Sequence, residues 1–384
     1  MKYLILFLLF LASVPVFSQQ SKSQPQLQSQ PLSKLSIATD NYILIDFQSG
    51  QTLISKNASQ RVEPASLTKM MTAYITFSAL RQKRITLKQN VPVSEKAWRA
   101  KGSRMFIEPG RPVTVEELVS GLIVQSGNDA SIALAETIAG SEESFVQMMN
   151  KEAERLGMKN THFTNSTGLP NPEHFSTAYD LALLVSDTIR RFPEHYPLYS
   201  LREYTYNKIS QSNRNRLLWL DPNVDGLKTG YTKSAGYCLV ASAKRNNTRL
   251  ISIVLGAKSD NVRTMESQRL LNYGFLSYDT IRVFRKNQEV TAIQLWKGQR
   301  KILKTGFNHD LYFSLPKGQA AKLKATMEYK QPMIAPIRAG QEVGIVKFIF
   351  DGKQIAKYPL VALESIDNSN FFSRKWDEIL LLFN

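Results

Sequence analysis

The sequence predicts a mixed α and β fold, in which an antiparallel sheet flanked by helices is followed by a small all-β domain and a terminal amphipathic helix. Strand patterns lie at both ends of residues 37–278 with helical patterns between them, which is typical of one sheet covered by helices. Short strands with Gly and Pro turns fill residues 279–363, and residues 364–384 carry an apolar stripe. The 384 residues exceed the roughly 250–300 that a single core usually supports, so more than one domain is expected.

The composition is that of an ordinary globular protein, with 43% hydrophobic and 21% charged residues, which argues against disorder and a polytopic membrane protein. A formal net charge of +17 favours an anionic partner, such as nucleic acid, anionic lipid or an acidic polymer, without choosing among them. Cys238 is the single cysteine, which excludes a Cys-rich zinc site, and the histidines show no His-Glu-x-x-His spacing. We therefore expect no metal and no cofactor. The histidines are His162, His174, His195 and His309.

The N-terminal residues have the pattern of an export signal. Residues 1–18 combine a basic start with an apolar run from Tyr3 to Ala12, and Val16 and Ser18 stand at positions suited to signal peptidase. The alternative is an uncleaved anchor helix, but the apolar run is shorter than the roughly 20 residues that a membrane span needs. Residues 19–36, rich in Gln, Ser and Pro, predict a flexible linker. We expect the folded part to work outside the cytoplasm.

The first elements of the domain at residues 37–278 are a hairpin and a helix. Residues 41–55 predict a β-hairpin, because two apolar runs are separated by a turn at Ser49-Gly50. Residues 66–80 predict a mostly buried helix, since apolar residues recur at helical spacing and Pro64 stands just ahead of it.

A second helical region follows. Thr114 and Glu117 form a capping box for a helix that reaches Gln125, and residues 131–140 predict another helix. Residues 126–128 lie in the turn between the two helices. The remaining elements of this domain are strands at residues 237–243 and 249–257 and a helix at residues 262–273.

A serine and a lysine at the start of the first helix can react together. Ser66 and Lys69 stand one helical turn apart on the same face, so their side chains can touch. A serine is a poor nucleophile until a base takes its proton, and a lysine can be that base when burial or another cation lowers its pKa. The helix N-terminus adds free N–H groups that suit an oxyanion. Ser314 and Lys317 repeat this spacing, but Pro316 between them argues against a helix.

Two further triplets occur in the order that such a mechanism needs. These are Ser-Gly-Asn at residues 126–128 and Lys-Thr-Gly at residues 228–230, the second leading into a strand. Similar triplets at residues 259–261 and 304–306 stand in the wrong order or in the β domain. Each triplet alone is more typical of a cap or a turn, but all of them together and in order point to one site.

The chain resembles the penicillin-recognising serine D-alanyl-D-alanine carboxypeptidases, the low-molecular-mass penicillin-binding proteins. The resemblance covers nearly the whole chain from Asn41 onward. Its C-terminal part is similar to the family's all-β domain, including Pro-Leu-Val-Ala at residues 359–362. The most specific segments are Glu-Pro-Ala-Ser-Leu-Thr-Lys-Met-Met-Thr at residues 63–72, Gln-Ser-Gly-Asn-Asp-Ala at residues 125–130, Asn-Ser-Thr-Gly-Leu-Pro at residues 165–170 and Val-Asp-Gly-Leu-Lys-Thr-Gly at residues 224–230.

The resemblance implies roles for individual side chains. Ser66 would be the acylated nucleophile and Lys69 its general base. Ser126 would relay a proton to the leaving amine, and Asn128 would hold the substrate amide. Lys228 would lie near Ser126 and the substrate, and its charge would help lower the pKa of Lys69.

Further residues follow from the same resemblance. Thr229 and Gly230 would bind substrate, and the backbone N–H of Tyr231 would complete an oxyanion hole with that of the nucleophile. Many relatives have His where Tyr231 stands. Arg214 and Arg263 would face the terminal carboxylate of the substrate, with a surface salt bridge as the alternative for each. Cys238 is expected to be a buried strand residue without a role.

The implied partners are a peptidoglycan stem peptide ending in D-Ala-D-Ala and β-lactams as covalent inhibitors, and nucleic acid fits poorly with export. The implied location is the periplasm, on the outer face of the inner membrane. Residues 364–384 would be the attachment, as an amphipathic helix lying in the interface. The alternative is that this helix packs on the β domain. Its apolar stripe consists of Phe372, Trp376, Ile379, Leu380 and Phe383.

Three other functions compete with a carboxypeptidase. A β-lactamase of class A needs a Glu that activates the deacylating water, and no Glu-x-x-Leu-Asn occurs between Asn128 and Lys228. An endopeptidase that cuts D,D cross-links is closer, and the added β domain favours the carboxypeptidase over it. A catalytically vestigial scaffold is disfavoured, because all reacting positions are intact.

Overall fold

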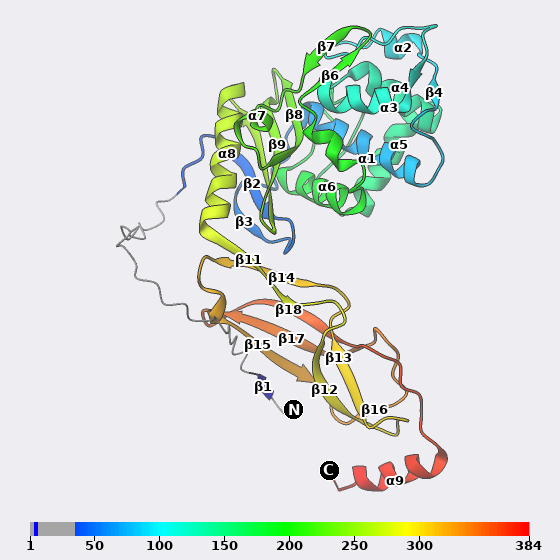
Figure 1. Cartoon of the computed structure of the whole chain (residues 1–384), viewed down its shortest axis with the longest axis vertical. Coiled ribbons are helices and arrows are strands. Elements are labelled where there is room, and N and C mark those ends of the chain that lie inside the picture. Colours follow the sequence, from blue (N-terminus) through cyan, green and yellow to red (C-terminus); the bar gives the residue numbers. More distant parts are fainter. Residues whose placement is uncertain (1–3, 7–34, 384) are drawn as a thin grey trace, which may run out of the picture. The chain divides into compact units, whose positions relative to one another are not determined.

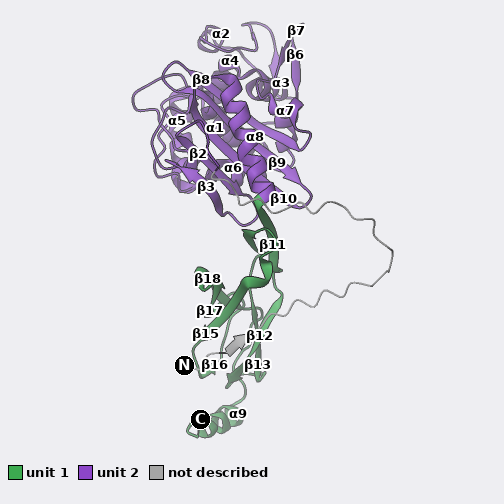
Figure 2. Cartoon of the chain, turned by 90° about the vertical axis from the view of Figure 1, so that its left-hand side faces the viewer, with its two compact units in different colours: residues 1–33, 277–384 green, residues 34–276 purple. Residues whose placement is uncertain are grey.

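The structure is a computed structural model that describes residues 4–6 and 35–383. The predicted signal peptide and linker therefore lie almost entirely outside the described residues. The described residues divide into two compact units, one within residues 34–276 and the other within residues 277–384 together with residues 4–6 (Figure 2).

The sheet of the first unit has five antiparallel strands in the order β3-β2-β10-β9-β8 (Figure 1). Successive side chains along a strand point to opposite faces. Accordingly, Ile43 and Ile45 belong to one hydrophobic core and Tyr42 and Leu44 to another. Both faces of the sheet are therefore covered, which explains the continuous apolar runs of the sequence. The strands are β2 (Asn41–Asp46), β3 (Thr52–Lys56), β8 (Val224–Thr232), β9 (Gly236–Arg245) and β10 (Thr248–Ala257).

Helices cover the two faces unequally. The larger core joins the sheet to α1, α3, α4, α5 and α6, while α7 and α8 pack on the opposite face. Gly274 lets α8 approach the sheet, because a Cβ there would lie 2.5 Å from a methyl group of Leu250. The helices are α1 (Lys69–Arg81), α2 (Glu95–Trp98), α3 (Val115–Ser120), α4 (Asn128–Ala139), α5 (Glu142–Arg155), α6 (Ala178–Arg191), α7 (Leu217–Leu220) and α8 (Asp260–Ser277).

Short elements complete the first unit and refine two predictions. The helix expected at 66–80 begins as a 3-10 turn, η1 (Ala65–Thr68), before α1. The capping box of Thr114 and Glu117 is confirmed, but α3 ends at Ser120 and continues as a π-helical turn, η2 (Gly121–Gln125). The other short elements are β4 (Asn90–Val91), β5 (Val113–Thr114), β6 (Glu203–Tyr206), β7 (Ile209–Ser212) and the 3-10 turn η3 (Tyr196–Ser200).

The second unit is an all-β domain with its own core, in which Phe313 and Phe348 are buried at a ring distance of 4.7 Å. Its main sheet has the order β1-β15-β17-β18-β13-β12-β16, and β11 pairs with β14. The predicted fold class is confirmed. The elements are β1 (Leu4–Leu6), β11 (Tyr278–Phe284), β12 (Glu289–Trp296), β13 (Ile302–Gly306), β14 (Leu311–Pro316), the 3-10 turn η4 (Ala320–Lys322), β15 (Leu323–Tyr329), β16 (Met333–Ile334), β17 (Glu342–Phe350) and β18 (Lys353–Ala362).

The C-terminal helix α9 (Phe371–Leu381) begins later than the segment 364–384 expected for it. Asn370 caps it by accepting a hydrogen bond from the backbone N–H of Ser373. The preceding residues belong to the β domain, because Ile366 is buried in the domain core and pairs with Ile337. Over residues 4–6 and 35–383, no helix combines the length and apolar character that crossing a membrane requires.

Candidate active site

The predicted nucleophile and base lie side by side at the junction of η1 and α1. Nζ of Lys69 is 3.2 Å from Oγ of Ser66. Ser66 is partly exposed, whereas Lys69 is buried. Gly230 of β8 passes close to η1, since a Cβ there would lie 3.0 Å from the Pro64 carbonyl oxygen. The glycine of the Lys-Thr-Gly triplet thus brings the strand against the serine.

Burial lowers the pKa of Lys69 to about 7, and the nearby Arg214 guanidinium lowers it further while Asp129 opposes the shift. Its amine also donates a hydrogen bond to the Thr167 carbonyl oxygen at 2.6 Å. A lysine in this state exchanges protons near neutral pH, which is the property a general base needs.

The Ser-Gly-Asn and Lys-Thr-Gly triplets meet at the same place. Nζ of Lys228 on β8 donates to Oγ of Ser126 at 2.8 Å, and both side chains are buried. Ser126 has a left-handed backbone with φ of 60°, which ends the turn η2 and points the chain into α4. The pKa of Lys228 is lowered well below its ordinary value by burial first and then by Lys69. The two lysines repel each other when both are charged, so each disfavours the charged form of the other, and Arg214 lowers the pKa of both.

Asn128 and Asp129 are the first residues of α4, and their side chains make different contacts. The Asn128 amide Nδ2 donates to the Lys101 carbonyl oxygen at 2.5 Å, while its Oδ1 is buried with no hydrogen-bond partner among the described residues. Such an acceptor is available to a ligand N–H. Asp129 accepts from the backbone N–H groups of Met105 and Phe106, which fixes the 103–107 segment over the site.

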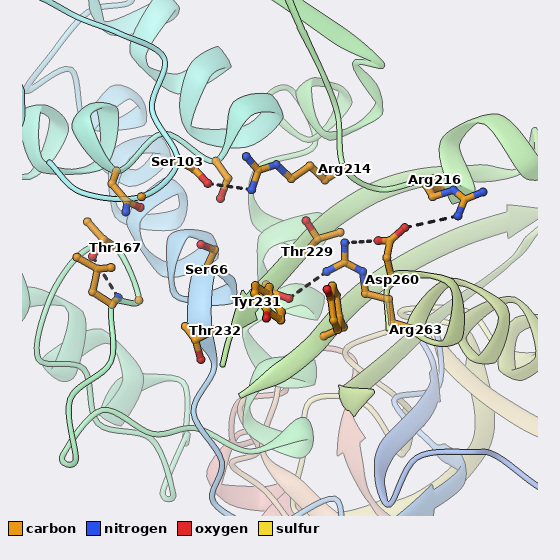
Figure 3. Close-up of a pocket in the computed structure, with 17 residues that line it drawn as sticks. Ser66, Ser103, Thr167, Arg214, Arg216, Thr229, Tyr231, Thr232, Asp260 and Arg263 are labelled. Atoms are coloured by element: carbon orange, nitrogen blue, oxygen red, sulfur yellow. Dashed lines mark hydrogen bonds and ion pairs between the residues drawn. The ribbon is translucent and has the colours of Figure 1, made fainter. Parts of the chain in front are cut away.

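A cleft of about 740 Å³ lies at this site (Figure 3). Its walls include Ser66, Ser126, Asn128, Thr229, Gly230 and Tyr231. The Tyr231 ring is half exposed and lies 4.3 Å from the ring of Tyr237. One cleft therefore holds the nucleophile, hydroxyl and amide groups, and an aromatic rim.

The two predicted arginines both line the cleft, but their surroundings differ. Arg214 donates to Ser103 Oγ at 2.8 Å. Arg263 is buried and donates to the carbonyl oxygens of Gly230 and Cys238, and it also pairs with Asp260 at 2.5 Å. Arg263 therefore connects β8 and β9 to α8, which leaves Arg214 as the guanidinium better placed to donate hydrogen bonds to a ligand carboxylate.

Some cleft residues were missed from the sequence. Thr167, whose carbonyl meets Lys69, had no assigned role, although it lies in the Asn-Ser-Thr-Gly-Leu-Pro segment at residues 165–170. The signal was Gly168, which has φ of 83° and lies so close to Ala65 that a Cβ would be 1.8 Å from its carbonyl oxygen. Asp260 belongs to the 259–261 triplet, which stands in the wrong order in the sequence and was not expected at the site. It nevertheless lines the cleft and pairs with Arg216 at 3.5 Å.

The repeated motifs lie elsewhere. Lys304 is on β13 and Ser314 on β14, so both belong to the second unit. Lys304 pairs with Glu289 at 3.4 Å on an exposed surface. Cys238 is buried in β9, and burial raises its pKa to about 11, which suits an inert strand residue.

Comparison with known proteins decides the family. Residues 24–259 match the D-alanyl-D-alanine carboxypeptidase family, and residues 278–368 match the C-terminal domain of penicillin-binding protein 5. The chain belongs to the D-alanyl-D-alanine carboxypeptidase family. The predicted resemblance is thus confirmed for both parts of the chain.

Relatives in this family extend over most of the chain. It is 43% identical over 351 residues to the D-alanyl-D-alanine carboxypeptidase DacC of Escherichia coli, which covers 89% of this chain and 88% of that protein. The crystal structure of penicillin binding protein 5 from Haemophilus influenzae is 40% identical and covers 88% of this chain and 100% of that one, with a TM-score of 0.85. Penicillin-Binding Protein D2 from Listeria monocytogenes in its ampicillin-bound form is 31% identical and covers 64% of this chain and 100% of that one, with a TM-score of 0.59.

Proposed function

We propose that the chain is a serine-type D-Ala-D-Ala carboxypeptidase that removes the terminal D-alanine from peptidoglycan stem peptides. The observation that carries this conclusion is the paired contact of Ser66 with Lys69 and of Ser126 with Lys228 in one cleft of a family member. The family match and the relatives over most of the chain support the activity and disfavour a scaffold or a β-lactamase.

The reaction follows from this arrangement. Ser66 Oγ attacks the carbonyl carbon of the penultimate D-alanine as its proton passes to Lys69 Nζ, and the carbonyl oxygen becomes an oxyanion. When the oxyanion collapses, the bond to the terminal D-alanine nitrogen breaks, and that nitrogen takes a proton relayed through Ser126. Water then hydrolyses the ester on Ser66 and restores the serine.

The other predicted residues serve binding in this proposal. The backbone N–H groups of Ser66 and Tyr231 stabilise the oxyanion. The unpartnered Oδ1 of Asn128 accepts from a substrate amide, and Thr229 with Gly230 lies along the extended peptide on β8. Arg214 binds the terminal carboxylate of the substrate. Arg263 holds β8 in place through its hydrogen bond to the Gly230 carbonyl oxygen.

The same chemistry makes β-lactams covalent inhibitors. A β-lactam carbonyl acylates Ser66, but the ring remnant stays attached, and the chain lacks the Glu-x-x-Leu-Asn segment of class A β-lactamases between Asn128 and Lys228. The ester is therefore expected to persist. The ampicillin-bound form of the Listeria relative supports this binding.

Release of D-alanine tests the activity. The purified protein is incubated with a peptide ending in D-Ala-D-Ala, with the matched peptide ending in D-Ala-L-Ala and with a D,D-cross-linked dimer. We expect D-alanine from the first peptide and at least about tenfold less product from the other two, because a cleft that positions both the carboxylate and the methyl group of a terminal D-alanine misplaces an L-residue and has to fit a second peptide in the dimer. Faster cleavage of the dimer would establish an endopeptidase instead, and no product from any of them would favour a scaffold.

The acylation rate should depend on the proton of Lys69. Its pKa is lowered to about 7, so the neutral amine that accepts the serine proton is lost as pH falls below that value. Below this pKa, each further decrease of one pH unit lowers the neutral fraction of Lys69 about tenfold, and the acylation rate should fall by the same factor. The measurement is the rate constant for acylation by a fluorescent penicillin from about pH 5 to about pH 9. A flat profile would contradict a lysine base.

We also propose that the protein is exported to the periplasm and attached to the outer face of the inner membrane by α9. The predicted signal peptide at residues 1–18 supports export. Asp377 of α9 is buried and accepts from Lys301 Nζ at 2.6 Å, so the polar side of the helix rests on the β domain. The stripe that includes Phe372 and Trp376 is exposed, as a helix lying in a membrane interface requires.

A further inference from the structure

The segment at residues 164–169, here called the Thr167 loop, provides the nearer of two hydrogen-bond partners of the Lys69 amine. The Thr167 carbonyl oxygen lies 2.6 Å from Nζ, whereas Ser66 Oγ lies at 3.2 Å. A lysine amine sits on a flexible stem with three donors, so its position depends on fixed acceptors. The groups that fix the Thr167 carbonyl therefore influence where the amine lies.

Asn165 fixes the inside of the Thr167 loop. Its Oδ1 accepts from the backbone N–H groups of Thr167, Gly168 and Leu169 at 3.1, 2.7 and 3.2 Å, and from Thr167 Oγ1 at 2.9 Å. This pattern sets the loop's internal shape. It does not attach the loop to the rest of the domain.

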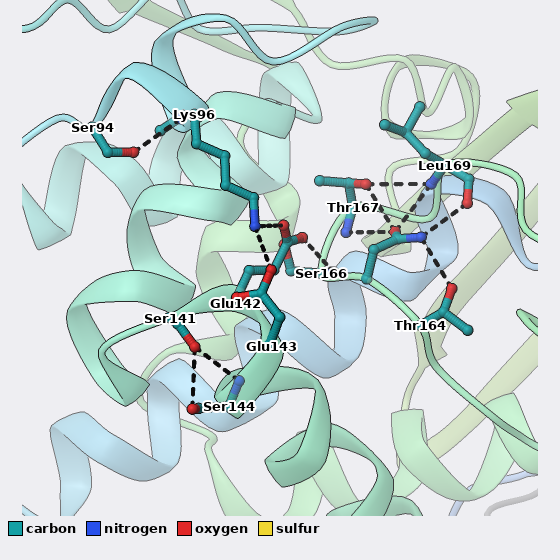
Figure 4. A network of polar contacts seen from close by, with 12 residues as sticks. Ser94, Lys96, Ser141, Glu142, Glu143, Ser144, Thr164, Ser166, Thr167 and Leu169 are labelled. Atoms are coloured by element: carbon teal, nitrogen blue, oxygen red, sulfur yellow. Dashed lines mark hydrogen bonds and ion pairs between the residues drawn. The ribbon is translucent and has the colours of Figure 1, made fainter.

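Glu142, at the start of α5, attaches the loop from one side. Its Oε1 accepts from both the backbone N–H and the Oγ–H of Ser166, at 3.0 and 2.7 Å (Figure 4). Its Oε2 pairs with Lys96 at 3.0 Å, and the Glu142 side chain is only 11% exposed. A buried carboxylate adds little net stability, so its bonds to Ser166 point to a role in holding the loop.

His174 attaches the loop from the other side. The backbone N–H of Thr164 donates to its Nδ1 at 3.1 Å, and its Nε2 lies 2.8 Å from Thr68 Oγ1, beside Lys69. Burial lowers the His174 pKa to about 4, so the ring is neutral near neutral pH and keeps Nδ1 as an acceptor. The ring thus joins the loop to the turn that carries Ser66.

We propose that Glu142 and His174 are positioning residues for the acylation of Ser66, because they hold the Thr167 loop so that its carbonyl fixes the Lys69 amine. This inference rests on the proposed function. Neither residue reaches the cleft lining, so each acts through the loop.

The geometry gives the role a signature in the pH profile. A carbonyl that accepts from the Lys69 ammonium favours the charged form, so a loosened loop lowers the pKa of Lys69 further. The acidic limb of the pH–rate profile for acylation should then move to lower pH. The plateau rate should fall, because the Lys69 amine loses its orientation. The other groups facing Lys69 are Arg214, Asp129, Lys228 and the neutral His174, and Glu142 variants leave them in place.

The test compares Glu142→Ala with Glu142→Gln in the full chain. Acylation by a fluorescent penicillin is measured from about pH 5 to about pH 9, normalised to folded protein by circular dichroism. We expect the plateau acylation rate of Glu142→Ala to be at least about tenfold lower than that of the wild type. The midpoint of its pH–rate profile should lie about half a pH unit or more lower. Glu142→Gln keeps an acceptor for Ser166 and should restore the rate to within about threefold and the midpoint to the wild-type value.

Ser141→Ala is the matched control, because Ser141 caps α5 through the Ser144 N–H and, among the described residues, forms no hydrogen bond with the Thr167 loop (Figure 4). It should lower stability without moving the midpoint. An unchanged midpoint in Glu142→Ala, or the same shift in Ser141→Ala, would overturn the proposal. If Glu142→Ala does not fold, Ser166→Ala, which removes the hydroxyl donor to Glu142, takes its place with the same two readouts. A wild-type protein that is not acylated at all would contradict the proposed function instead.

Discussion

Ser66→Ala is expected to abolish covalent labelling by a fluorescent penicillin and to reduce D-alanine release by at least about a thousandfold. The substitution removes only the hydroxyl that lies 3.2 Å from Lys69 Nζ, so no ester can form while the cleft keeps its shape. Labelling is measured on denaturing gels after incubation with the penicillin, and thermal unfolding shows whether the variant stays folded. Retained labelling at the wild-type rate would show that another nucleophile is acylated.

The repeated motifs of the sequence supply matched controls for this experiment. Lys304 belongs to a second Lys-Thr-Gly triplet but lies on β13 with 58% of its side chain exposed. Lys304→Ala should therefore label like the wild type, whereas Lys228→Ala removes the partner of Ser126 and should label at least about a hundredfold more slowly. A folded but inactive Lys304 variant would show that the triplet at residues 304–306, rather than the one at residues 228–230, belongs to the active site.

The sequence allowed the sheet and the reacting side chains to be predicted because both depend on short-range patterns. The alternation of Tyr42, Ile43 and Leu44 along a strand indicates two buried faces, and the spacing of Ser66 and Lys69 brings them together in any helical turn. These features survive small errors in element boundaries. The start of α1 at Lys69 rather than at Ser66 left the Ser66 to Lys69 contact in place.

The supports of the site could not be predicted in the same way, because they join distant segments. Glu142 reaches Ser166, and His174 reaches Thr68 across 106 positions of the chain. No periodicity links such pairs. The same limit applied to Ile366, which was expected in the segment of the terminal amphipathic helix, yet is buried in the β-domain core and pairs with Ile337.

Removal of residues 371–384 is expected to move the protein from the membrane fraction to the soluble fraction while D-alanine release from a soluble peptide stays within about twofold of the wild type. The deletion starts after Asn370, because cutting at residue 363 would also remove Ile366 from the β-domain core. The stripe contributes large exposed side chains, with Phe372 83% and Phe383 84% exposed, and each can gain roughly 1.5–3 kcal/mol on full burial in an apolar phase. Cell fractionation and binding to lipid vesicles measure the distribution.

Two substitutions on α9 separate the apolar stripe from the charge of the helix. Trp376→Ser interrupts the stripe, in which Trp376 is 62% exposed, and should weaken vesicle binding by about tenfold. Arg374→Gln removes a charge from the same helix without touching the stripe and should weaken binding to neutral vesicles by less than about threefold. Because the stripe binds by apolar burial, raising the salt concentration should leave the binding to neutral vesicles largely unchanged. If the shortened protein still sediments with membranes, another part of the chain holds it there and α9 is not the attachment.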